Sequence, residues 1–170
     1  MAKEKTAKTN AMRILDSLKI PYEMQAYECD EFVDGVTTAD KLGLSHELVY
    51  KTLVTVAKSK AYYVFVIPIE AELDLKAAAR AVNEKALELL PLKELTPVTG
   101  YVRGGCTAIG MKKAFPTVVD ASVKGILYLH VSGGRPGLQL KLSVADYVKA
   151  SRAKVADVIM HTLTTEKIEA

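Results

Sequence analysis

The stretch TLVTVAKSKAYYVFVIPI, residues Thr52 to Ile69, decides the fold class of this chain of 170 residues. Two runs rich in β-branched and aromatic residues flank the polar tetrapeptide KSKA. Such runs, joined by a short polar connection, are typical of a β-hairpin. We therefore expect two neighbouring antiparallel strands here, the second of which closes at Pro68.

Helical patterns surround the hairpin. Apolar residues at steps of three and four predict a helix over most of NAMRILDSLKI (10–20), and ELDLKAAARAV (72–82) predicts another, with Asp74 near its N-terminus. Thr37 or Thr38 is expected to cap a short helix that stops near Gly43, and Ser45 a further turn. The final helical region is expected over 143–159, capped by Ser143.

The remaining segments are expected to be strands and short turns. YEMQAYE (22–28), TVVDASV (117–123), GILYLHVSGG (125–134) and GLQLKLS (137–143) favour strands, whereas 84–100 is expected to hold short helical turns. Helices and strands therefore alternate irregularly. This order favours an α/β or α+β domain around a mixed sheet and argues against a regular parallel βαβ series.

Length and composition favour one globular domain. The expected domain spans residues 1–170, with a core at about 10–159 and a polar tail after 160. No apolar run is long enough to cross a membrane, and two cysteines exclude a disulfide framework, so we expect a cytoplasmic protein. A net charge of +3 permits a nucleic-acid partner without arguing for one.

The glycine-rich stretch YVRGGCTAIGMKK (101–113) lacks the standard phosphate motifs, because Met111 follows Gly110 where a P-loop has lysine. Cys106 has no histidine in a recognisable signature to act as its base, and we interpret it as a small packed residue. The glycines either shape a surface loop or let backbone N–H groups line an anion-binding nest or oxyanion hole.

Lys51 is the most informative charge, at the start of the first hairpin strand. It either extends from the strand end into solvent or serves as a point charge for a phosphate or developing oxyanion. A second glycine-rich turn, VSGGRPG (131–137), also adjoins strand ends, so the two loops suggest a pocket without naming its ligand. No metal-ligand spacing is present.

Several blocks, taken in order, resemble one known family. VYKTL, LDLKAAA, GYVRGGCTAIGMKK, PTVVDAS and LYLHVSGGRPGLQLKL are similar to the YbaK/EbsC family of freestanding aminoacyl-tRNA editing proteins, over about Asn10 to Ile159. The resemblance implies a single α/β domain with a mixed, partly barrel-like sheet flanked by helices.

The resemblance also implies a function. Prolyl-tRNA synthetase attaches cysteine to tRNA(Pro) because cysteine and proline are similar in size. A second site must then hydrolyse the mischarged ester. The family deacylates Cys-tRNA(Pro), with Cys-tRNA(Cys) as a further substrate, and needs neither metal nor cofactor. In its proposed mechanism the substrate thiol attacks its own ester and leaves as a thiolactone, a lyase-like release. The implied partners are the 3′ end of aminoacyl-tRNA and prolyl-tRNA synthetase.

The family's functional positions map onto this chain residue by residue. Lys51 and Gly104 match its catalytic positions. The matching substrate-binding positions are Tyr27, Gly105, Cys106, Thr107, Ser132, Gly133 and Gln139.

Two departures leave the substrate open. Thr107 and Ala108 replace the usual Ser-Pro, and Gln139 stands where close relatives carry an aspartate. Because glutamine is neutral, a carboxylate role does not transfer. The alternatives are editing of Ala-tRNA(Pro) with an activated water, and a non-catalytic module that binds aminoacyl-tRNA or a synthetase.

Overall fold

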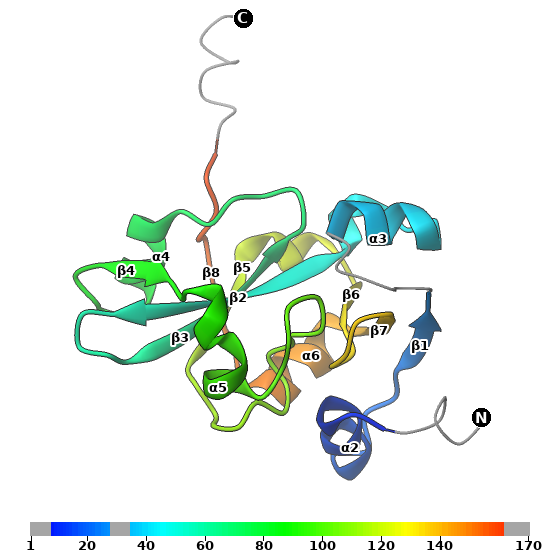
Figure 1. Cartoon of the computed structure of the whole chain (residues 1–170). Helices are drawn as coiled ribbons and strands as arrows, with labels where there is room; N and C mark the ends of the chain where they lie inside the picture. Colours follow the sequence, from blue (N-terminus) through cyan, green and yellow to red (C-terminus); the bar gives the residue numbers. More distant parts are fainter. Residues whose placement is uncertain (1–7, 28–34, 162–170) are drawn as a thin grey trace, which may run out of the picture.

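The computed structural model describes residues 8–27 and 35–161, and Figure 1 shows the whole chain. The expected hairpin is confirmed: β2 (Tyr50–Ala57) and β3 (Tyr62–Pro68) pair antiparallel, with Val54 opposite Val64. The polar connection turns at Lys60, whose φ is +74°. The first strand begins two residues earlier than the pattern indicated, so Lys51 lies within it.

The described strands form two sheets. The five-stranded sheet has the order β4-β2-β3-β5-β8, where β4 is Leu87–Leu89. Strand β5 (Thr117–Asp120) runs parallel to β3 and to β8 (Lys154–Ala156). The three-stranded sheet is antiparallel, with the order β1-β7-β6 (Glu23–Ala26, Leu138–Ser143 and Tyr128–Ser132). The mixed α/β class is thereby confirmed. The sheets meet through one parallel bridge, Val49 with His130, and are not closed into a barrel.

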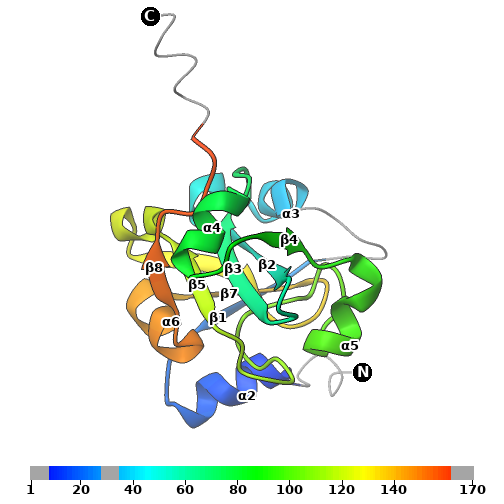
Figure 2. The same cartoon turned by 90° about the vertical axis from the view of Figure 1, so that its left-hand side faces the viewer.

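Most expected helices are present. They are α2 (Asn10–Ser17), α3 (Gly35–Leu42), η1 (His46–Leu48), α4 (Leu75–Ala81) and α6 (Val144–Ser151). Asp74 caps α4 by accepting hydrogen bonds from the N–H groups of Lys76 and Ala77. Ser143 caps α6 by accepting from Asp146 N–H, as expected. In Figure 2, α5 (Leu95–Thr99) and α6 lie at opposite sides of the molecule.

Four local expectations were wrong. The last helix ends at Ser151, with Arg152 as its C-cap in the left-handed region at φ +56°, and β8 follows because its backbone pairs with β5. Segment 84–100 contains helical turns (η2, Leu92–Glu94, and α5), but also the strand β4 (Leu87–Leu89), which pairs with β2. A 3₁₀ helix, η3 (Ala121–Gly125), follows β5 where we expected the strand to continue to 123.

The fourth correction concerns the caps near residue 40. Helix α3 begins at Gly35, so Thr37 and Thr38 lie inside it and not at its N-cap position, although it ends before Gly43 as expected. Ser45 does occupy the N-cap position of η1, but its side chain makes no capping hydrogen bond.

Most of the core among the described residues lies in two apolar clusters, a larger and a smaller one, and Ala39, Val49 and Ile69 form a minor third. The larger cluster packs α2 and α6 against the three-stranded sheet, with Met12, Tyr147 and Leu140 fully buried. The smaller cluster packs α4 against the five-stranded sheet around Phe65. The central strand β3 contributes to both, because its alternate side chains point to opposite faces: Val66 belongs to the larger cluster and Phe65 to the smaller.

No helix among the described residues combines the length and the apolar character that crossing a membrane requires.

Candidate functional site

A cavity of about 550 Å³ lies where the two sheets and the glycine-rich loops approach one another. Its volume falls within the usual range for small-molecule sites, about 300–1,000 Å³. Six of the nine positions singled out from the sequence line it, although they come from five separate segments: Tyr27, Lys51, Gly104, Cys106, Ser132 and Gln139.

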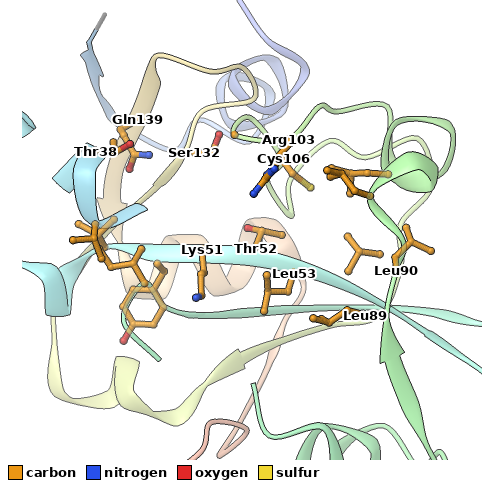
Figure 3. Close-up of a pocket in the computed structure, with 18 of the residues that line it drawn as sticks. Thr38, Lys51, Thr52, Leu53, Leu89, Leu90, Arg103, Cys106, Ser132 and Gln139 are labelled. Atoms are coloured by element: carbon orange, nitrogen blue, oxygen red, sulfur yellow. The ribbon is translucent and has the colours of Figure 1, made fainter. Parts of the chain in front are cut away.

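Lys51 lies on β2, opposite Ile67, in the middle of the lining in Figure 3. Its side chain is half-buried, and this desolvation lowers the pKa of the ammonium group, with the charge of Glu72 acting in the opposite direction. A partly desolvated ammonium group interacts more strongly with a nearby anion than a fully hydrated one does. The geometry therefore favours the point-charge interpretation of Lys51 over extension into solvent.

The cavity has a cationic lining. Lys51 and Arg103 are its charged members, and no aspartate, glutamate or histidine occurs among the described residues that line it. Such a lining favours ligands that carry negative charge or develop it during a reaction.

The polar side chains of one end of the cavity come mainly from the three-stranded sheet, and Val36, Val49 and Ile69 add apolar surface to the lining. Ser132 on β6 and Gln139 on β7 are direct cross-strand partners, which places their side chains next to each other. Tyr27 is fixed beside them because its N–H donates to the carbonyl of Gly137 at 2.9 Å. Gln139 is only 7% exposed, and its Oε1 is buried without a hydrogen-bond partner among the described residues. An unpaired buried acceptor costs free energy, which makes this side chain a candidate for function.

Backbone geometry explains two glycines of the first loop. Gly104 lines the cavity with φ +86°, a conformation that favours glycine. A Cβ atom on Gly105 would lie 2.6 Å from the Cα of Arg135, so the two glycine-rich loops pack directly against each other. The Gly105 N–H donates to the Val102 carbonyl at 2.9 Å, so this donor is already engaged within the loop.

The structure places Gly105, Thr107 and Gly133 outside the cavity lining. Thr107 is 1% exposed, and its hydroxyl has no hydrogen-bond partner. Gly133 is held by packing, since a Cβ atom there would lie 2.7 Å from the Leu138 side chain, and its carbonyl accepts from the Thr9 hydroxyl at 2.6 Å. Direct substrate contacts by these three residues stay predictions.

Cys106 lies at the cavity as a protonated thiol. Burial raises its pKa to about 12, so the thiolate is scarce at neutral pH. No histidine is among the described lining residues, so the described lining itself offers no imidazole base for this thiol. Among the described residues, no group of three or more His, Cys, Asp or Glu side chains could hold a metal ion.

Residues 33–150 match the model of the aminoacyl-tRNA editing domain, which is well over half of the chain. The chain belongs to the aminoacyl-tRNA editing domain family. It is also 39% identical over 160 residues to an Enterococcus faecalis protein named "Putative Cys-tRNA(Pro)/Cys-tRNA(Cys) deacylase EbsC", covering 93% of this chain and 98% of that protein. The family resemblance seen in the sequence is thereby confirmed.

Solved structures share the fold of this editing domain. One, described as a "putative trans-editing enzyme for prolyl tRNA synthetase", has a TM-score of 0.77 at 21% identity, covering 92% of this chain and 100% of the other. Another, described as hypothetical protein APE2540, has a TM-score of 0.80 at 22% identity, covering 89% and 99%.

Sequence reasoning missed the apolar end of the editing domain's cavity. Five leucines line it, and we call them the leucine wall: Leu53, Leu89, Leu90, Leu92 and Leu95. Four of them come from LELLPLKEL (87–95), whose density of leucines was the available signal. We expected short helical turns there, and the pairing of β4 with β2 instead brings the segment to the cavity.

Proposed function

We propose that this protein hydrolyses the ester of mischarged Cys-tRNA(Pro) in trans, with Cys-tRNA(Cys) as a second substrate. The observation that carries the proposal is a cavity that joins Lys51 and Gly104 to Gln139 and whose described lining residues include no activated nucleophile, since burial keeps the Cys106 thiol protonated. The E. faecalis relative, whose printed name includes both of these substrates, supports it.

The proposed chemistry relies on the thiol of the substrate. The cysteine sulfur attacks its own ester carbonyl, a C–S bond forms, the C–O bond to the ribose breaks, and the thiol proton passes to the ribose oxygen. The products are a thiolactone, which water then opens, and a tRNA with a free 3′ end. The protein supplies orientation and electrostatic stabilisation, which is compatible with the absence of a nucleophile–base pair among the described lining residues.

Each lining group has a role in this proposal. Lys51 stabilises negative charge near the ester and the ribose–phosphate. The Gly104 segment lets the backbone approach the reacting carbonyl without interference from a side chain. Gln139 and Ser132 orient the aminoacyl group at the polar end. Prolyl-tRNA synthetase, the source of the error, is the proposed partner.

A panel of substrates tests the function: deacylation of Cys-tRNA(Pro), Ala-tRNA(Pro) and Ser-tRNA(Pro), each measured with and without prolyl-tRNA synthetase. We expect cysteinyl ester to be preferred, because only cysteine carries the attacking thiol. Equal hydrolysis of the alanyl ester would exclude the substrate-thiol mechanism and favour an activated water. Binding without hydrolysis of any ester would identify a non-catalytic module.

Lys51→Ala is the matching variant. Removing the ammonium group should lower kcat/KM for Cys-tRNA(Pro) by about 10²–10³, the range for loss of one transition-state donor. Lys141→Ala is the control, because Lys141 is also a partly buried strand lysine but lies outside the cavity, with its Nζ 5.1 Å from the Tyr128 ring centroid. Full activity of Lys51→Ala would remove Lys51 from the mechanism.

A further inference from the structure

The two ends of the cavity differ in chemistry. Thr38, Gln139 and Ser132 lie toward one end, and Leu53, Leu89 and Leu90 toward the other, with Lys51 and Thr52 between them in Figure 3. A ligand that fills the whole cavity therefore needs a polar group at one end, an apolar face at the other, and negative charge between them.

The leucine wall is larger than a cysteine side chain requires. It draws on β2, β4, η2 and α5, and two of its members are among the most exposed large apolar side chains of the described residues: Leu89 is 51% exposed and Leu92 54%. Exposed apolar surface next to a cavity often marks a contact that a ligand completes.

The wall presents side-chain surface more than hydrogen-bonding backbone. The N–H of Leu90 already donates a hydrogen bond to the Val54 carbonyl at 2.9 Å. β4 is held by its ladder with β2, in which Thr55 is opposite Leu89. Such a surface suits the flat face of an aromatic ring, which apolar side chains contact without reading its edges.

We propose that the leucine wall is a subsite for the terminal adenine base of the aminoacyl-tRNA. This assignment rests on the proposed function, because the terminal nucleotide reaches the cavity as part of the aminoacyl-tRNA substrate. In that substrate the order is amino acid, ester, ribose, base. The cavity presents the matching order of polar end, Lys51 and leucine wall.

The charge of the lining supports a nucleotide over a purely apolar ligand. Lys51 and Arg103 both line the cavity, and no described lining residue is acidic. A phosphate attached to the same ribose would therefore lie close to the ammonium group of Lys51. A wall that does not read base edges is sufficient here, because the 3′-terminal base is the same in every tRNA.

The test measures AMP binding by NMR titration, with ribose 5-phosphate as a probe that lacks the base. Leu92→Ser and Leu89→Ser replace exposed side chains, so both variants should fold. Each should weaken AMP binding by about five- to tenfold, the effect of losing part of one leucine contact, and leave ribose 5-phosphate binding unchanged. Leu127→Ser is the control, because Leu127 is 80% exposed and outside the cavity.

Kinetics on Cys-tRNA(Pro) complete the test. The two wall variants should raise KM by the same factor as they weaken AMP binding, with kcat unchanged. Absence of AMP binding to the wild-type protein would overturn the subsite, as would an equal loss of ribose 5-phosphate binding. A fall in kcat with AMP binding unchanged would overturn it too, since the wall would then hold the aminoacyl group.

The two proposals can fail separately. If AMP binds in a manner that depends on Leu92 but no ester is hydrolysed, the nucleotide subsite stands and the proposed deacylase function falls. If cysteinyl ester is hydrolysed and AMP binding does not depend on the wall, the function stands and the subsite falls.

Discussion

Thr107 and Gln139 are both buried polar residues, and their different positions give them different proposed roles. Each has a side-chain oxygen that is buried without a hydrogen-bond partner, but only Gln139 lines the cavity. The sequence identified both positions because they match functional positions of a family. Sequence alone could not show that Thr107 lies away from the cavity. Residues 104–110 form one continuous glycine-rich loop, and only its three-dimensional path decides which side chains reach the cavity.

The contrast leads to a paired prediction. Thr107→Val and Gln139→Met each remove a buried unpaired oxygen at nearly constant size, and such an oxygen costs about 1–3 kcal/mol. Neither variant should therefore have a lower free energy of unfolding than the wild type, measured by denaturant titration. Activity should separate them: kcat/KM on Cys-tRNA(Pro) should stay within about twofold for Thr107→Val and fall at least about tenfold for Gln139→Met, which would lose the proposed hydrogen bond between Gln139 and the aminoacyl group. A loss of activity in Thr107→Val would restore Thr107 as a substrate contact.

Helices and strands with a regular apolar periodicity could be predicted from the sequence. Short strands that form only by pairing with a neighbouring strand could not. The pattern located α2, α4 and the β2–β3 hairpin because each buries a regular stripe of its own side chains. The strands β4 and β8 have three residues each, too few to show an alternation, and exist because β2 and β5 offer hydrogen bonds to them. The leucine wall was not predicted for the same reason, because it depends on the pairing of β4 with β2.

Helix α3 is joined to the end of β3 by a histidine. His46 on η1 contacts Asp40 of α3 at 2.7 Å through Nε2 and Glu70, just after β3, at 2.9 Å through Nδ1. Hydrogen bonds to Glu70 and then to Asp40 raise the pKa of His46 above its usual value near 6.5. A raised folded-state pKa means that the stabilisation is complete below the unfolded-state pKa and is lost as pH rises through the folded-state value.

This pair of contacts predicts a pH-dependent contribution to stability. The difference in unfolding midpoint between the wild type and His46→Gln should be larger at about pH 5.5 than at about pH 8.5. The wild-type profile alone would not isolate it, because burial lowers the pKa of His130 and so acts with the opposite sign. Comparison with the variant cancels the contribution of His130. A difference that does not vary with pH would mean that His46 acts only through packing.

At the scale of the whole molecule, the arrangement of the two sheets was beyond the sequence pattern. Strand periodicity indicates which face of a strand is buried, but not which strand is its neighbour. The parallel pairing of β3 with β5 joins segments about fifty residues apart, and β1 pairs with β7 across more than a hundred. The candidate cavity lies between such distant segments, so its members could be named from a family likeness while their grouping required the fold.

The shared strand β3 leads to the expectation that both sheets unfold together. Phe65 fills the smaller cluster and is fully buried, whereas Leu140 on β7 is 1% exposed in the larger one. Phe65→Ala should lower the free energy of unfolding by about 3–5 kcal/mol and Leu140→Ala by about 2–5 kcal/mol. Because Val66, next to Phe65, packs in the larger cluster, loss of either cluster removes support for β3 and hence for the cavity.

Hydrogen exchange with circular dichroism checks this coupling. In both variants, amides of β6 and β7 should lose protection by the same free energy as amides of β3 and β5, and the dichroism should show a single transition. If Leu140→Ala exposed only the three-stranded sheet, the sheets would be separate cooperative units. Gln139 and Ser132 could then move away from Lys51 without global unfolding, and the polar end of the cavity would open independently of the leucine wall.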